Sequence, residues 1–201
     1  MFVLVVLPSM GSTKMRLSSV ELSSMAKDNF RYRTQKILQI LLVVYVGLTL
    51  VETVLLRMAG MSWFEAVCNS FSTIATGGFC TRNASIAAYG SLWIEMIVVF
   101  FMAVSGLHFG LIFATLTGKS NNIFRSEISR YYVLSLLLGG LIVSVSLWAS
   151  DMYPTFASSM RYGFFQVVSV SSTTGFATAD SSVWTPLAIM VLTLFTMQCA
   201  C

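Results

Sequence analysis

Long apolar stretches alternate with shorter polar segments along this chain. Four of these stretches are long enough to cross a hydrocarbon core of ~30 Å as helices that rise ~1.5 Å per residue. They cover residues 37–57, 91–117, 131–149 and 183–201. Residues 1–10 begin with an apolar run too short to span by itself, which is expected to be the end of a preceding membrane helix. The pattern predicts an all-α integral membrane protein.

The polar segments between these stretches carry most of the positive charge. Nine of the twelve Lys and Arg residues lie in the segments 11–36 and 118–130. Lys and Arg concentrate in cytoplasmic loops of membrane proteins. Both segments are therefore predicted to be cytoplasmic loops of a multi-pass protein of the cell (inner) membrane.

Two further stretches, 62–75 and 158–172, are moderately apolar but too short to cross a bilayer readily. Each leads into a glycine-containing loop, ATGGF at 75–79 and TTGFA at 173–177. The Thr-Gly steps of the two loops lie 98 residues apart (175 − 77 = 98), and the flanking sequences align when one residue is dropped. We therefore predict two repeats, over 37–117 and 131–201, each made of a membrane helix, a re-entrant pore helix, a filter loop and a second membrane helix.

Glycine loops at membrane depth suit the binding of a dehydrated cation. Backbone outside a helix survives in a bilayer only where it is buried in protein or lines a wet cavity. Glycine lets successive carbonyl groups turn the same way, and rings of carbonyl oxygens replace the hydration shell of a monovalent cation. An ordinary extracellular turn also accounts for a single Thr-Gly step, but the paired occurrence favours a filter.

Composition narrows the function classes. Hydrophobic residues make up 56% of the 201 residues and charged residues 10%, which excludes a soluble domain of this size. The net charge of +4 is not arranged as a basic patch with interleaved aromatic residues, so a nucleic-acid partner is not expected. The sequence contains no CxxC pair, a single histidine and no nucleophile–base constellation, so neither a metal site nor an enzyme is predicted.

Specific sequence motifs carry a resemblance to a known family. The stretch FSTIATGGFCTRNASI, followed by FFMAVSGLHFGLIF, resembles the second repeat of the TrkH/KtrB-type potassium transporter subunits. The stretch FFQVVSVSSTTGFATAD resembles the third repeat of the same family. The family pore has four such repeats, so the chain resembles a fragment that holds the second and most of the third.

The resemblance implies a potassium-transporting pore without a cofactor, K⁺ being the transported ion. It implies that backbone carbonyl groups of the two loops form part of the selectivity filter, with the next residue of each loop shaping the outer mouth. The residues concerned are Ala75, Thr76, Gly77 and Gly78 in the first loop and Thr173, Thr174, Gly175 and Phe176 in the second. It further implies a homodimer of pore subunits in the lipid bilayer and a cytosolic nucleotide-binding regulatory subunit.

Several alternatives stay open. The chain is alternatively a membrane scaffold protein that transports nothing, in which case both glycine loops are solvent-exposed. His108 serves either in helix packing, beside Gly106, or in lining the pore. Glu52 and Glu95 either pair with Arg57 or Arg161 or reach the membrane interface.

Overall fold

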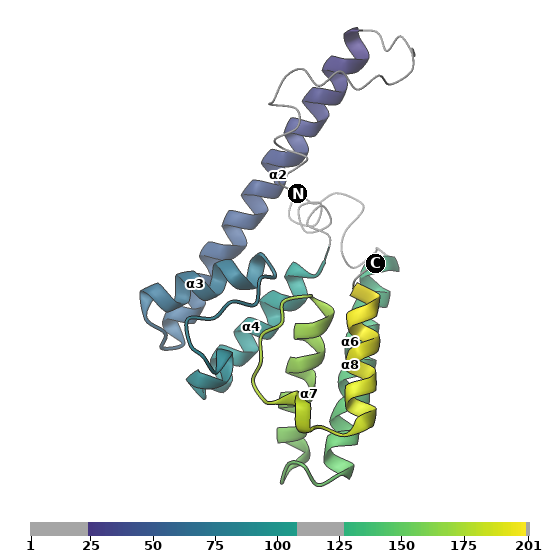
Figure 1. Cartoon of the computed structure of the whole chain (residues 1–201). Coiled ribbons are helices and arrows are strands. Elements are labelled where there is room, and N and C mark those ends of the chain that lie inside the picture. Colours follow the sequence, from purple (N-terminus) through teal and green to yellow (C-terminus); the bar gives the residue numbers. More distant parts are fainter. Residues whose placement is uncertain (1–23, 108–126, 200–201) are drawn as a thin grey trace. The chain divides into compact units, whose positions relative to one another are not determined.

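A computed structural model describes residues 24–107 and 127–199, which are helical and contain no strand (Figure 1). Four helices overlap the apolar stretches expected to cross the membrane, namely α2 (Ser24–Met58), α4 (Leu92–Ser105), α6 (Glu127–Ala149) and α8 (Pro186–Cys199). Helices α3 (Trp63–Ile74, 12 residues) and α7 (Phe156–Ser171, 16 residues) lie between them in the sequence, where re-entrant pore helices are expected. Two 3₁₀ turns, η1 (Ser85–Tyr89) and η2 (Ser181–Val183), follow α3 and α7. This order agrees with the predicted helical chain.

Helix α2 begins earlier than the apolar pattern indicates. Residues 24–36, assigned to a polar loop from their charge, are helical. No Gly or Pro occurs between Ser24 and Val46, so nothing in the sequence interrupts the helix before the apolar stretch begins. The chain forms two compact units, residues 1–38 and 39–201, and the second contains all the other helices named above.

Two of the described helices are long and apolar enough to cross a membrane, namely Leu38–Met58 and Ser129–Ala149. Only 22% and 33% of the residues in their apolar windows are buried within the chain. Their remaining apolar side chains therefore face outward, as expected of helices solvated by lipid. Leu92–Ser105 and Pro186–Met197 are shorter apolar helices, and the prediction for 108–117 lies outside the described residues.

Helices α3 and α7 each begin at a capping residue. Ser62 caps α3 through a capping box, in which its hydroxyl accepts from the Glu65 amide and the Glu65 carboxylate accepts from the Ser62 amide. The hydroxyl of Thr155 caps α7 by accepting from the Ser158 amide, at 3.2 Å. The capping residues therefore determine where α3 and α7 begin. The length of each helix then determines where the following glycine loop starts.

Helices α6, α7 and α8 pack together, with α4 against α7, around one hydrophobic core. Close approach of α6 and α7 depends on small residues. A side chain at Gly140 would overlap the ring of Phe164, and one at Gly163 would crowd Ser144. Phe165 and Val168 of α7 and Val143 of α6 are fully or almost fully buried at this contact. The packing holds α7 firmly, and α7 carries the second glycine loop at its C-terminal end.

Candidate functional site

The first glycine loop, residues 75–79, begins as a continuation of α3. The Ala75 amide donates to the Phe71 carbonyl at 3.0 Å, and the Gly77 amide donates to the Ser72 carbonyl at 2.7 Å. Thr76 has φ of +52° and Gly78 φ of +71°, so the chain turns through the left-handed region twice. The loop leaves the helix end as a tight, hydrogen-bonded turn.

The second glycine loop, residues 173–177, repeats this backbone pattern. The Ser172 amide donates to the Val168 carbonyl at 2.9 Å, and the Thr174 amide to the Ser169 carbonyl at 3.0 Å. Thr173 has φ of +59° and Gly175 φ of +81°. Each of these features lies 97 residues after its counterpart in the first loop (173 − 76 = 97).

The structural spacing of 97 corrects the spacing of 98 derived from the Thr-Gly steps. At a spacing of 97 the loops align without a dropped residue, and Gly78 corresponds to Gly175. Phe79 then corresponds to Phe176, while Gly77 corresponds to Thr174. The Thr-Gly dipeptides of the two loops are therefore not structurally equivalent. The glycine equivalent to Gly175 is Gly78, which also takes positive φ, and not Gly77, which follows threonine.

The two loops meet each other. A Cβ atom at Gly78 would overlap the carbonyl oxygen of Thr174, so only glycine permits this approach. Beyond the second loop, the Ala87 amide of η1 donates to the Ala177 carbonyl at 3.2 Å, and the Ala177 amide donates to the Ser85 hydroxyl at 3.2 Å. The two loops are therefore in contact although they are far apart in sequence.

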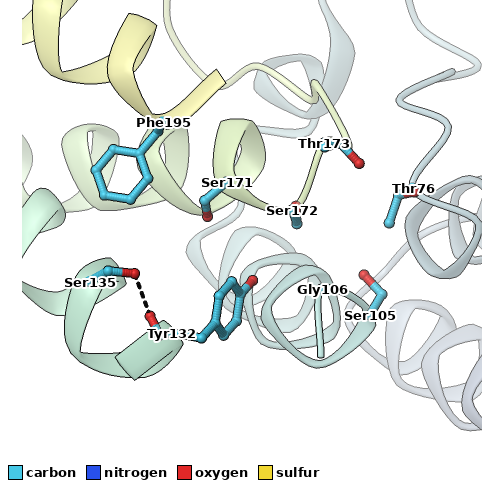
Figure 2. Close-up of a pocket in the computed structure, with 9 residues that line it drawn as sticks. All are labelled: Thr76, Ser105, Gly106, Tyr132, Ser135, Ser171, Ser172, Thr173 and Phe195. Carbon is cyan, nitrogen blue, oxygen red and sulfur yellow. Dashed lines mark hydrogen bonds between the residues drawn. The ribbon is translucent and has the colours of Figure 1, made fainter. Parts of the chain in front are cut away.

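A cavity of about 360 Å³ lies beside the starts of the two loops, and Figure 2 shows its lining. Seven of the nine lining residues bear hydroxyl groups, namely Thr76, Ser105, Tyr132, Ser135, Ser171, Ser172 and Thr173. Gly106 and Phe195 complete the wall, and the tip of the Tyr132 ring rests directly on Gly106. The cavity is therefore rich in hydroxyl groups and has no charged side chain in its lining.

The helix ends add to the field in this cavity. Thr76 and Thr173 on its wall lie within two residues of the last residues of α3 and α7, Ile74 and Ser171. The C-terminal end of a helix carries a partial negative charge. Two such ends, together with hydroxyl oxygens, give a neutral cavity that favours a cation.

The predicted site residues differ in whether they line the cavity and in how deeply they are buried. Thr76 and Thr173 line the cavity, and Gly78 touches Thr174. Phe176 is buried, whereas Ala75, Gly77 and Gly175 are exposed or partly so. The sequence prediction missed the hydroxyl residues supplied by neighbouring helices, Ser105, Tyr132 and Ser135. Hydroxyl residues within apolar helices could have indicated a polar cavity from the sequence. Which of these residues face the cavity depends on how the helices pack.

One predicted ion pair forms between two helices. The Glu95 carboxylate accepts two hydrogen bonds from Arg161, from Nε at 2.6 Å and from Nη2 at 2.7 Å. Pairing of Glu95 with Arg161 was one of the alternatives predicted from the sequence. Among the described residues Glu52 forms no ion pair with Arg57 or Arg161, and its side chain is fully buried; Arg57 donates to the Met61 carbonyl at 3.0 Å. His108 lies outside the described residues.

A second ion pair joins Arg82 to Glu65 at 2.8 Å, after the first loop. The hydrogen bond from Arg82 lowers the pKa of Glu65 below its ordinary value of 4.5, with help from Ser62. After the second loop, the hydroxyl and amide of Ser182 lower the pKa of Asp180. Both carboxylates are thus held in their charged form near the loops.

Comparison with known families decides where the chain belongs. The sequence model of TrkH, described as cation transport protein, matches residues 1–139. This chain belongs to the TrkH family. The chain is therefore a membrane protein, in agreement with its two membrane-length helices.

Individual TrkH relatives align over almost the whole chain. The Trk system potassium uptake protein TrkH of Salmonella typhimurium is 36% identical over 191 residues, 94% of this chain and 39% of the relative. TrkH of Halomonas elongata is 37% identical over 183 residues, 89% of this chain and 37% of the relative. The crystal structure of the potassium transporter TrkH from Vibrio parahaemolyticus matches with a TM-score of 0.72 and 27% identity, covering 96% of this chain and 39% of that chain. The chain thus spans about two-fifths of the length of these TrkH proteins.

Proposed function

We propose that this chain is part of the pore-forming subunit of a Trk/Ktr-type potassium uptake system. The observation that carries the proposal is the paired geometry of the two glycine loops. Both follow a short helix, both take positive φ at the same two positions, and they converge beside a hydroxyl-lined cavity. The names of the relatives supply potassium as the ion.

In this proposal the loops 75–79 and 173–177 are filter segments that select by backbone carbonyl groups. The filter residues are Ala75, Thr76, Gly77 and Gly78 with Thr173, Thr174, Gly175 and Phe176. No side chain in either loop is charged, so selection rests on the spacing of peptide oxygens, which replace the hydration shell of K⁺. The chain supplies two such segments and is therefore a partial pore.

The cavity would hold the ion before or after it passes the filter. Its hydroxyl groups can hydrogen-bond to the water around a cation, and the C-terminal ends of α3 and α7 stabilise positive charge. The absence of charged side chains from its lining keeps the ion from binding too tightly, since conduction needs both entry and release. A cation would therefore gain favourable contacts without being trapped.

The proposal includes the setting of the protein. The segments 11–36 and 118–130 would face the cytoplasm and the glycine loops the opposite side of the cell (inner) membrane. A homodimer and a cytosolic nucleotide-binding regulatory subunit are proposed from the family resemblance. Residues 11–23 and 118–126 of the two cytoplasmic segments lie outside the described residues.

The direct test is ⁸⁶Rb⁺ uptake and growth at low potassium in a bacterium that lacks its own potassium uptake systems. Gly175→Ala is expected to abolish growth rescue, because it forces a side chain at φ of +81° within the filter. Gly90→Ala is the matched control, since Gly90 also has positive φ, +57°, and open space around its Cα. Equal rescue by both variants would contradict a filter role for the second loop.

A labelling experiment separates the filter from the scaffold alternative. Cys80 lies immediately after the first glycine loop and is partly buried. If the loops bind K⁺, a thiol reagent added from outside should react more slowly with Cys80 in potassium than in choline, because the bound ion orders the loop. Identical rates in both salts would favour a scaffold.

A further inference from the structure

An ion pair between a buried carboxylate and a partly exposed arginine joins the two proposed repeats. Glu95 lies in the first turn of α4, and Arg161 lies in α7. Both carboxylate oxygens of Glu95 accept from Arg161, at 2.6 and 2.7 Å. The Glu95 side chain is 6% exposed and that of Arg161 30%. A bidentate ion pair of this kind fixes both the distance and the relative orientation of the two side chains.

The pair has mainly apolar and aromatic neighbours. One side is an apolar hollow of about 420 Å³, whose lining includes Met96, Leu137 and Phe164. The Arg161 guanidinium also lies 5.4 Å from the centre of the Tyr162 ring. The Glu95 carboxylate is almost fully covered while Arg161 is 30% exposed, so separating the pair would leave a buried carboxylate without a partner of comparable strength.

The pair and the cavity lie about three helical turns apart along both α4 and α7. Ser105, on the cavity wall, follows Glu95 by ten residues along α4 (105 − 95 = 10). Ser171, also on the wall, follows Arg161 by ten residues along α7 (171 − 161 = 10). At ~1.5 Å per residue, the pair therefore clamps α4 to α7 roughly 15 Å from the cavity.

The first proposed repeat has no counterpart of this arginine. At the spacing of 97, Arg161 corresponds to Phe64, an exposed residue of α3 (161 − 97 = 64). The charged pair of that repeat, Arg82 with Glu65, is more exposed, at 56% and 15%, and joins α3 to its own following loop. Among the described residues, Glu95 and Arg161 form the one ion pair between the two repeats.

We infer that Glu95 and Arg161 are positioning residues for ion selection, which set the spacing of α4 and α7 and thereby the shape of the cavity and second glycine loop. This inference rests on the proposed function. Neither residue touches the ion path. Loss of the pair would let the two helices shift, and such a shift would change how the peptide oxygens of the second loop are placed around the ion.

The experiment measures uptake of ⁸⁶Rb⁺ and ²²Na⁺ by the full chain in membrane vesicles, normalised to the amount of folded protein. Glu95→Gln and Arg161→Gln are each expected to lower the Rb⁺/Na⁺ uptake ratio by about tenfold or more. The exchanged double variant, Glu95→Arg with Arg161→Glu, should restore a substantial part of the ratio, because the pair is re-formed in reverse. Arg82→Gln is the matched control and should leave the ratio unchanged, because an exposed pair contributes little.

A second measurement reads the helix spacing itself. With the four native cysteines replaced, spin labels are placed at Met96 and Met160, which are exposed on α4 and α7. Their distance distribution should broaden in Glu95→Gln and narrow again in the exchanged double variant. A merely stabilising pair would lower the yield of folded protein and leave the uptake ratio of the remaining protein unchanged.

The outcomes separate the two proposals. If the unaltered chain takes up no Rb⁺, conduction by this chain alone is refuted, and the spin-label distances still decide whether the pair sets the spacing of the helices. If the unaltered chain is selective and both single variants keep its Rb⁺/Na⁺ ratio, the positioning role is overturned while the proposed function stands.

Discussion

The two glycine loops share a backbone path but not an environment. The Phe176 side chain is 0% exposed, whereas its counterpart Phe79 is 83% exposed. The hydroxyl of Ser169 donates to the Phe176 carbonyl at 2.6 Å, while the corresponding hydroxyl of Ser72 is buried and has no hydrogen-bond partner among the described residues. The shape of each loop is thus specified locally, by the helix end and a glycine, but its support comes from neighbouring elements.

The difference follows from what packs around each loop. The second loop places Phe176 in the hydrophobic core, and its last residue, Ala177, is hydrogen-bonded to η1. The first loop follows α3, which packs against α4 but has exposed apolar residues such as Phe64 and Phe71. Within this chain the second loop is therefore the better supported, and substitutions should affect the two loops differently.

The largest expected contrast is between the two phenylalanines. Phe176→Ala should destabilise the protein by about 3–5 kcal/mol, because it removes a fully buried aromatic ring from the core. Phe79→Ala should change stability by less than about 0.5 kcal/mol, because its ring is already exposed. Thermal unfolding of the purified protein in detergent measures both. Equal losses would mean that Phe79 is covered in the folded protein.

A smaller contrast is expected between the two serines. Ser169→Ala should cost about 1 kcal/mol, because the Phe176 carbonyl loses its donor. Ser72→Ala should be close to neutral, because no hydrogen bond is lost at that site. The same unfolding experiment compares them, and a greater loss for Ser72→Ala would show that this hydroxyl has a partner in the membrane.

The smallest expected effect concerns pH and the first loop. Because the pKa of Glu65 is lowered by Arg82, its charged form stabilises the fold above pH 4.5, and this stabilisation is lost as the pH falls through the lowered value. The melting temperature should therefore fall slightly on acidification below pH 4.5, and the fall should be smaller in Arg82→Gln. A variant with the same acid dependence as the unaltered chain would assign the effect to another carboxylate, such as Asp180.

Much of the helical framework was predictable from the sequence, because apolar stretches and capping residues act over a few positions. The Ser62–Glu65 capping box and the apolar helix that ends at Ala149 are examples. The alternatives for Glu95 included its true partner, Arg161, since few charges occur in the apolar parts of the chain. These features depend on composition and local spacing.

The rest could not be predicted because it depends on packing between distant segments. The loop register of 97 rests on backbone angles, which the repeated Thr-Gly dipeptide did not reveal. The contribution of Tyr132 to the cavity depends on the absence of a side chain at Gly106, on a different helix. The beginning of α2 at Ser24 was missed because polar residues were read as a loop, although nothing in them stops a helix.

The conformation of Thr76 and Thr173 has a consequence for how these positions can vary. Both are β-branched, yet both hold positive φ, an arrangement that costs of order 1–3 kcal/mol at each residue. Glycine would relieve that strain at either position but would remove a hydroxyl and a methyl group from the cavity wall. Threonine at both positions thus places hydroxyl groups on the cavity wall at a cost in stability that glycine would not carry.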